Sequence, residues 1–125
     1  MSLKKIRLEL ARDHEFPEGS HRHGYEFVAP LNEEGHLDPA GWKTRRSECR
    51  VTRFWGDEDH ENGHLVRKPG GHWAFHYDIH GDPDDDEAGY RFSSHPFLPG
   101  EYVSIKDHDD DSLRTFRVMR VQDLN

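Results

Sequence analysis

Cysteine is almost absent from this chain, which contains only Cys49. A single cysteine excludes an intramolecular disulfide and a zinc site built from several thiolates. Long apolar runs are also missing, since no stretch approaches the roughly 20 residues of a membrane-spanning helix. Residues 1–12 lack the apolar centre of a signal peptide. We therefore expect a soluble cytoplasmic protein with no membrane partner.

Apolar residues are few, at 32% of the chain, whereas charged residues make up 34%. Three Trp, seven Phe and four Tyr nevertheless supply a large apolar area from few residues, which argues against a disordered chain. At 125 residues the chain is long enough to form one hydrophobic core. We expect a single domain that covers residues 1–125.

Positive charge is scarce as well. Lys and Arg number 17 against 25 Asp and Glu, which gives a net charge of −8. This balance argues against a nucleic-acid partner, because phosphate contacts need clustered Lys and Arg. Histidine is abundant instead: protonation of all eleven imidazoles would change the formal charge from −8 to +3. The surface charge should therefore depend strongly on pH between about 5 and 7.

Common signatures of enzymes are missing too. The chain has no Gly-x-Ser-x-Gly elbow, no phosphate-binding loop and no dinucleotide fingerprint. Cys49 follows two arginines and precedes a third, which favours a reactive thiolate. A lone cysteine between a helix and a strand is more often a packed apolar residue. Whether the protein is an enzyme stays open.

Alternation of apolar and polar residues predicts short strands along most of the chain. Asp38-Pro39 is typical of a helix start, and one short helix should run from there to about Glu48. No regular alternation of strands and helices is visible, which argues against a doubly wound fold. The predicted fold is mainly β: a small antiparallel barrel or sandwich of six to eight strands with one short helix. The expected strands are 5–11, 25–31, 50–55, 64–68, 72–80, 90–92, 101–107 and 113–121.

Segment 72–80 is the most informative part of the sequence. A period of two with aromatic residues on one face is typical of a half-buried strand. The apolar face carries Trp73, Phe75, Tyr77 and Ile79, and the opposite face carries His72, Ala74, His76, Asp78 and His80. Three imidazoles and a carboxylate therefore share one side of the expected sheet.

The sequence from Lys68 to His72 predicts a hairpin with a three-residue loop, in which Gly71 takes the left-handed conformation. This loop would place His64 directly opposite His76, with their Cβ atoms about 4.5–5.5 Å apart. A two-residue loop would shift the pairing and turn His64 to the other face.

These histidines suggest a metal site on the sheet face. Imidazole is the commonest protein ligand for zinc and other transition metals, and a carboxylate completes many such sites. The predicted ligands are His64, His76, Asp78 and His80. The alternative interpretation is a solvated outer face on which polar residues keep the sheet soluble.

A second metal-ligand set is His21, His23 and Glu26. The His-x-His pair with a nearby carboxylate resembles the metal motif of cupin barrels, although in that family the Glu lies further from the pair. The resemblance implies a metal-dependent enzyme with His21 and His23 as ligands. The alternative interpretation is a loop with incidental histidines.

Two acidic runs, 82–87 and 107–112, begin like calcium-binding EF-hand loops. Neither has Gly at the sixth position or Glu at the twelfth, where that loop requires them. Weak calcium binding of another kind stays open. Solvated loops that protect the sheet edges are the simpler explanation.

Three hypotheses about function follow. The leading one is a small binding or interaction domain whose His-rich face holds a transition metal. The first alternative is a cupin-like metal-dependent enzyme, and the second is a structural protein whose acidic surface meets a basic protein partner. The sequence names neither a substrate nor a cofactor beyond the candidate metal.

Overall fold

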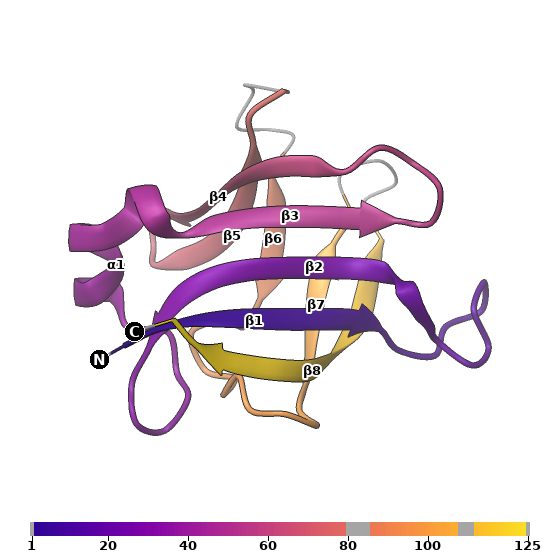
Figure 1. The fold of residues 1–125 in the computed structure, drawn as a ribbon, viewed down its shortest axis with the longest axis horizontal. Helices are drawn as coiled ribbons and strands as arrows, with labels where there is room; N and C mark the ends of the chain where they lie inside the picture. The colour runs from indigo at the N-terminus through magenta and orange to yellow at the C-terminus, as the bar shows by residue number, and fades with distance from the viewer. Residues whose placement is uncertain (1, 80–85, 108–111, 125) are drawn as a thin grey trace.

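The protein, in a computed structural model that describes residues 2–79, 86–107 and 112–124, is a closed barrel of eight antiparallel strands (Figure 1). Consecutive strands are hydrogen-bonded neighbours, and β8 closes the barrel against β1. The predicted fold class is confirmed in its barrel form. The strands are β1 Ser2–Leu10, β2 Ser20–Leu31, β3 Arg50–Trp55, β4 Glu61–Lys68, β5 His72–Tyr77, β6 Glu87–Tyr90, β7 Tyr102–Lys106 and β8 Leu113–Asp123.

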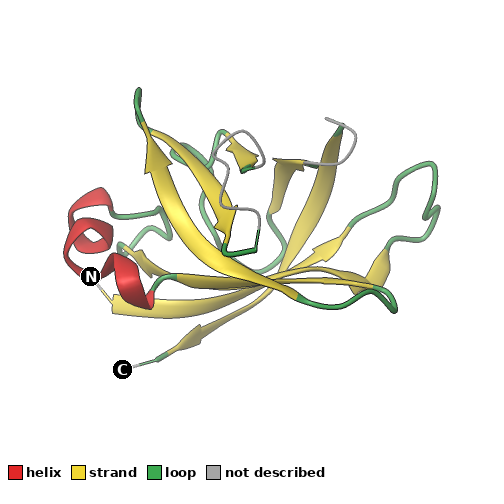
Figure 2. Cartoon of the chain, turned by 90° about the horizontal axis from the view of Figure 1, so that it is seen from above, coloured by secondary structure: helices red, strands yellow, loops and turns green. Residues whose placement is uncertain are grey.

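One short helix, α1 (Pro39–Arg45), lies between β2 and β3 and continues as a 3₁₀ turn over Arg46–Glu48. The carboxylate of Asp38 caps its first turn by accepting from the N–H groups of Ala40 and Gly41, as the Asp-Pro sequence predicts. Figure 2 shows α1 outside the sheet, at the end where the chain begins and finishes. No helix within the described residues is long and apolar enough to cross a bilayer.

Because successive strands run up and down, the connections alternate between the two ends of the barrel (Figure 1). The β1–β2 loop, residues 11–19, and the β3–β4 turn, residues 56–60, lie at one end, which we call the loop end. Helix α1 and the β4–β5 turn lie at the opposite end, which we call the helix end. There the indole N–H of Trp42 donates to the carbonyl of Leu65 at 2.8 Å and fixes the helix to the barrel.

The inward-facing side chains form one continuous apolar core. Aromatic rings dominate its centre: the ring centroid of Phe75 lies 5.1 Å from that of Phe27 and 6.0 Å from that of Phe92. Side chains fill the interior of small eight-stranded barrels in general. The grooves of this molecule accordingly lie on its outer surface.

The strand predicted over 72–80 ends earlier, at Tyr77. Its aromatic residues are buried as predicted. Ile79 is 81% exposed, so the assignment of Ile79 to the buried face is wrong. Beyond the end of β5, the backbone N–H of Asp78 still donates to the carbonyl of Asn62 on β4 at 3.0 Å. His80 lies outside the described residues.

Strand β2 begins at Ser20, although its polar first residues predict a loop up to residue 24. The pairing of β1 with β2 shifts its register between Glu9 and Leu10. Beyond this shift β2 continues alongside β3, where His23 pairs with Trp55. Pairing with both neighbouring strands therefore overrides the local preference of a polar segment.

Candidate functional site

His64 and His76 are directly paired across β4 and β5, as predicted. The predicted hairpin is also confirmed, because Lys68 pairs with His72 and Gly71 has a φ of 81°. Gly63 lets the two strands approach closely: a Cβ at this position would lie 2.0 Å from the carbonyl oxygen of His76. Because directly paired residues point to the same side of a sheet, the two imidazoles share the outer face of the barrel.

Each imidazole has a carboxylate partner. Nδ1 of His76 lies 2.6 Å from Asp86, and Nδ1 of His64 lies 3.5 Å from Asp78. Nε2 of His64 lies 2.9 Å from a guanidinium nitrogen of Arg50. A guanidinium can only donate, so Nε2 of His64 accepts this hydrogen bond and Nδ1 carries the proton toward Asp78.

This arrangement affects the two nitrogens that a metal would use. Donation from Nδ1 of His76 to Asp86 leaves Nε2 of the neutral ring free of a proton, which is the form that binds metals. Nε2 of His64 already accepts from Arg50, so a metal there must displace Arg50. No three His, Cys, Asp or Glu side chains gather into a metal-binding group in the described part of the chain. With His80 outside that part, the four-ligand site stays a prediction.

The pair lines a groove of about 420 Å³ between the 3₁₀ turn and the outer face of β4 and β5. We call it the His64–His76 groove. Arg46 and Arg67 bring permanent positive charge to it, and Trp42 supplies apolar surface. None of its described lining residues is a carboxylate. The lining consists of Trp42, Arg46, Ser47, His64, Leu65, Val66, Arg67 and His76.

The second predicted ligand set is not brought together. Glu26 forms ion pairs at 3.0 Å with Lys5 and Arg7 on the outer face. His23 instead packs between aromatic rings at the loop end, with centroids 4.5 Å from Phe16 and 4.7 Å from Trp55. Residues separated by three positions on a strand face opposite sides, which explains the separation of His23 from Glu26.

The surroundings of His23 favour the neutral imidazole. Burial lowers the pKa of His23, and the positive charges of Arg22, Arg53 and Arg114 lower it further. Its Nδ1 lies 2.6 Å from the hydroxyl of Ser20. His23 therefore acts within the described structure as a packed aromatic ring at the loop end.

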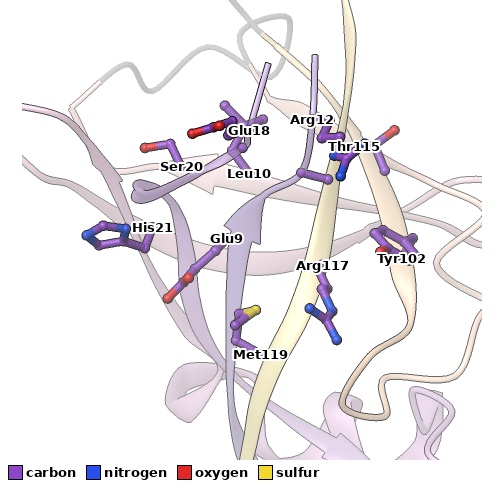
Figure 3. A pocket seen from close by; sticks show the side chains of 12 residues that line it. Glu9, Leu10, Arg12, Glu18, Ser20, His21, Tyr102, Thr115, Arg117 and Met119 are labelled. Atoms are coloured by element: carbon purple, nitrogen blue, oxygen red, sulfur yellow. The ribbon is translucent and has the colours of Figure 1, made fainter. Parts of the chain in front are cut away.

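His21 is exposed and lines a groove of about 760 Å³ on the outside of the barrel (Figure 3). Figure 3 shows His21 and Ser20 on one side of this groove and Tyr102 and Arg117 on the other. The lining mixes both signs of charge, with Glu9 among the acidic residues. Its chemistry therefore selects no single class of ligand.

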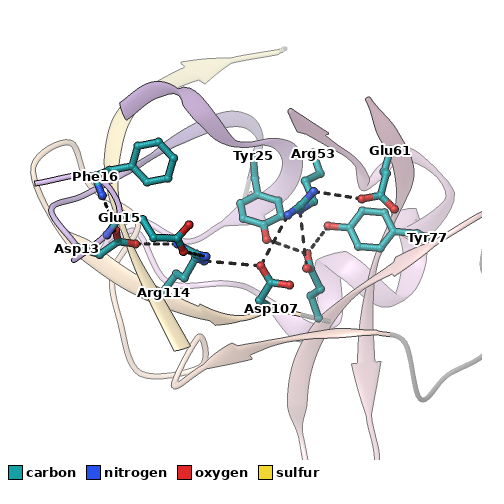
Figure 4. A network of polar contacts seen from close by, with 10 residues as sticks. Asp13, Glu15, Phe16, Tyr25, Arg53, Glu61, Tyr77, Asp107 and Arg114 are labelled. Atoms are coloured by element: carbon teal, nitrogen blue, oxygen red, sulfur yellow. Dashed lines mark hydrogen bonds and ion pairs between the residues drawn. The ribbon is translucent and has the colours of Figure 1, made fainter. Parts of the chain in front are cut away.

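A buried polar network, which the sequence did not predict, occupies the loop end of the barrel interior (Figure 4). Both tyrosine hydroxyls of the network donate to one carboxylate oxygen of Glu87, each at 2.7 Å. Burial raises the pKa of both tyrosines well above the ordinary value, and the charge of Glu87 raises it further. The network comprises Tyr25, Arg53, Glu61, Tyr77, Glu87, Asp107 and Arg114.

Two arginines connect this network across the barrel. Arg53 is 4% exposed and lies 3.2 Å from Glu61, 3.7 Å from Glu87 and 3.8 Å from Asp107. Arg114 lies 3.6 Å from the same Asp107. It also binds Asp13 and Glu15 of the β1–β2 loop, at 2.8 Å and 2.5 Å. The network therefore fixes that loop over the end of the barrel.

One signal of the network is visible in the sequence. Arg53 shares the inward phase of β3 with the buried Val51, so a charged residue stands where an apolar one is expected. Glu87 gave no such signal, because it ends an acidic run that is typical of a solvated loop. The structure buries Glu87 completely. Most of run 82–87 and of run 107–112 lies outside the described residues.

Cys49 is fully buried between the 3₁₀ turn and β3. Its thiol donates to the carbonyl of Arg45 at 3.5 Å. Burial raises the pKa of Cys49 to about 11, and the charge of Glu48 adds to this effect. The packed interpretation of this cysteine is favoured over a reactive thiolate.

Comparisons with protein-family models, with curated proteins and with solved structures find no match to this chain. The geometry of the residues is therefore the sole basis for a functional assignment.

We expect Tyr25→Phe and Tyr77→Phe each to lower the free energy of unfolding by about 1.5–3 kcal/mol, because each removes a buried hydrogen bond to a carboxylate. The double variant should deviate from the sum of the two effects, since both hydroxyls share one acceptor oxygen. Urea denaturation followed by Trp fluorescence measures this. Tyr102→Phe is the matched control, because Tyr102 is 53% exposed. Equal stability of all three single variants would refute the role of the network.

We expect the Cys49 thiol to react at pH 8 at least about 100-fold more slowly in the folded protein than in guanidinium chloride. A raised pKa keeps the folded-state thiol protonated at this pH, whereas an ordinary cysteine with a pKa near 8.5 is partly ionised. The release of a coloured thiolate from an aromatic disulfide reagent measures both rates. Equal rates would show that the thiol is accessible.

Proposed function

We propose that this protein is a small binding module, and that the His64–His76 groove binds a small anionic molecule with an apolar group. The observation that supports the proposal is the charge of the lining. Arg46 and Arg67 line the groove without a carboxylate among the described lining residues, although acidic residues outnumber basic ones in the chain as a whole.

The groove offers two kinds of contact. Guanidinium groups bind carboxylates, sulfonates and phosphates through charge-assisted hydrogen bonds. Trp42, Leu65 and Val66 supply apolar surface beside them. A ligand that satisfies both carries a negative charge on an apolar body.

Much of the groove is held rigidly before a ligand arrives. The indole of Trp42 is fixed by its hydrogen bond to Leu65, and the ring of His76 is oriented by Asp86. Strands β4 and β5 carry both histidines on a regular ladder. Such preorganisation reduces the entropy lost on binding.

The size of the groove favours a small molecule. Small-molecule sites in proteins typically enclose about 300–1,000 Å³, and this groove has about 420 Å³. No reaction is proposed for this groove.

A transition metal is the second candidate ligand, favoured by the direct pairing of His64 with His76. The bond from His76 to Asp86 resembles the outer-shell contacts that orient metal-binding imidazoles. Zinc or another transition metal would bind through Nε2 of both rings after displacing Arg50. The cupin-like enzyme is not carried into this proposal, because cupins are jelly rolls whereas this barrel is an up-and-down meander.

We expect the fluorescent probe 1-anilinonaphthalene-8-sulfonate to bind this groove, and Arg67→Gln to weaken its binding about 3- to 10-fold. Fluorescence titration measures the affinity of each variant.

Lys43→Gln is the matched control, because Lys43 lies on α1 but does not line the groove. Equal affinities of the Lys43→Gln and Arg67→Gln variants would contradict the anion site.

If the ligand of the groove is a transition metal, we expect zinc to bind the purified, tag-free protein. The His64→Ala/His76→Ala variant should lose this binding. Arg50→Ala should strengthen zinc binding, since it frees Nε2 of His64. Isothermal titration calorimetry at pH 7.5 measures the affinity and the stoichiometry. Zinc uptake that is unchanged in the double variant would exclude this pair as the metal site.

A further inference from the structure

A second groove, of about 640 Å³, crosses the outer faces of β1, β2 and β3. We call it the cationic groove. Lys5, Arg7, Arg22 and Arg50 line it, whereas Glu26 is the one carboxylate among its described lining residues. This concentration of positive charge stands out on a chain with a net charge of −8.

We propose that the cationic groove binds a small ligand that carries several linked phosphate groups. The two grooves have no lining residue in common, and this proposal does not rest on the function proposed for the His64–His76 groove.

Arg7 is the fixed element of the cationic groove. Its guanidinium lies 4.4 Å from the ring centroid of Phe54. It donates to Glu9 at 2.7 Å and to Glu26 at 3.0 Å, and it also reaches the carbonyl of His21 at 3.3 Å. A guanidinium has five N–H donors, so Arg7 keeps N–H groups for a ligand. Its charge is therefore positioned before binding.

The other three cations are more exposed and can turn toward a ligand. The side chains of Lys5, Arg22 and Arg50 are 45%, 58% and 51% exposed. Arg22 and Arg50 now pair with Asp57 and Asp78, whose side chains are also exposed. Exposed ion pairs contribute little stability, so exchange of these carboxylates for a ligand's phosphates costs little.

The spacing of the charges selects a ligand with more than one anionic group. Neighbouring strands lie about 4.8 Å apart, so the charges carried by β1 and β3 are spread over roughly 10 Å. A ligand with several linked anionic groups can contact cations carried by both strands at once. A chain of two or three phosphates spans the distance, and arginine matches phosphate oxygens through paired hydrogen bonds.

The overall charge of the protein selects a short ligand. A long nucleic acid would extend beyond the groove, over a surface whose net charge repels it. A short phosphate chain remains within the positively charged region. The low content of Lys and Arg is therefore compatible with this site.

Replacement of Glu26 provides a test of the proposal in which ligand binding should become tighter. Burial alone would raise the pKa of Glu26, but the hydrogen bonds from Lys5 and Arg7 outweigh this effect and lower it. Glu26 is thus ionised at neutral pH and competes with a ligand for both cations. Its replacement by Gln removes this competition and keeps the shape of the side chain.

The test is calorimetric titration of the full chain with inorganic triphosphate at about 50 mM NaCl. We expect one site per chain, binding about 3- to 10-fold weaker in Lys5→Gln, and binding about 3- to 10-fold tighter in Glu26→Gln. Higher salt should weaken the binding of every variant. Lys43→Gln, which changes a cation outside the groove, should bind as the unmodified protein does.

Several results would overturn the proposal. Absence of triphosphate binding would do so, as would equal affinities of the Lys5→Gln and Lys43→Gln variants. Monophosphate that binds as tightly as triphosphate would indicate a single-anion site. A single-stranded oligonucleotide that binds more tightly than triphosphate would indicate a macromolecular ligand. Circular dichroism of each variant separates a binding defect from a folding defect.

Discussion

Closure of the barrel by β8 on β1 is the constraint on which the rest of the structure depends. A closed sheet has no free edges, so each strand must present alternate residues to an interior of fixed size. That interior is occupied by aromatic rings such as those of Phe27, Phe75 and Phe92, which are buried and have no contact with solvent. Binding groups are consequently confined to the outer face and the two ends. Both proposed grooves lie on the outer face for this reason.

The buried charges at the loop end carry a large desolvation cost. Transfer of Arg53 and Glu87 from water to the barrel interior costs several kcal/mol per ion. Ion pairs of 3.6–3.8 Å are too long to be hydrogen bonds, so they offset only part of this cost. The two tyrosine hydroxyls on Glu87 provide short bonds in addition. Such a network favours one register for the strands that carry it, since a shift of one residue would turn Arg53 or Glu87 to the outer face and leave its buried partners without it.

The parts of this fold that could be predicted from the sequence are those determined by local patterns. The alternation over residues 72–77 shows which face is buried, and the Pro-Gly-Gly turn determines that His64 meets His76. The polar network depends instead on contacts between strands that are distant in sequence, so Glu87 resembled the solvated acids beside it. The prediction that Ile79 is buried was wrong for a related reason: a periodic pattern does not show where the partner strand ends. The cationic groove joins β1 with β3, and neither segment alone shows that their cations meet.

Arg50 links the two proposed grooves physically. It lines the cationic groove, and it donates to Nε2 of His64, which lines the other groove. A proton or a metal on Nε2 of His64 removes the acceptor of that bond and repels the guanidinium. Arg50 would keep its ion pair with Asp78 but lose its contact with His64, so its charge could engage a ligand in the cationic groove together with those of Lys5 and Arg7. Because linkage is reciprocal, a phosphate ligand that engages Arg50 would in turn free Nε2 of His64 for a metal.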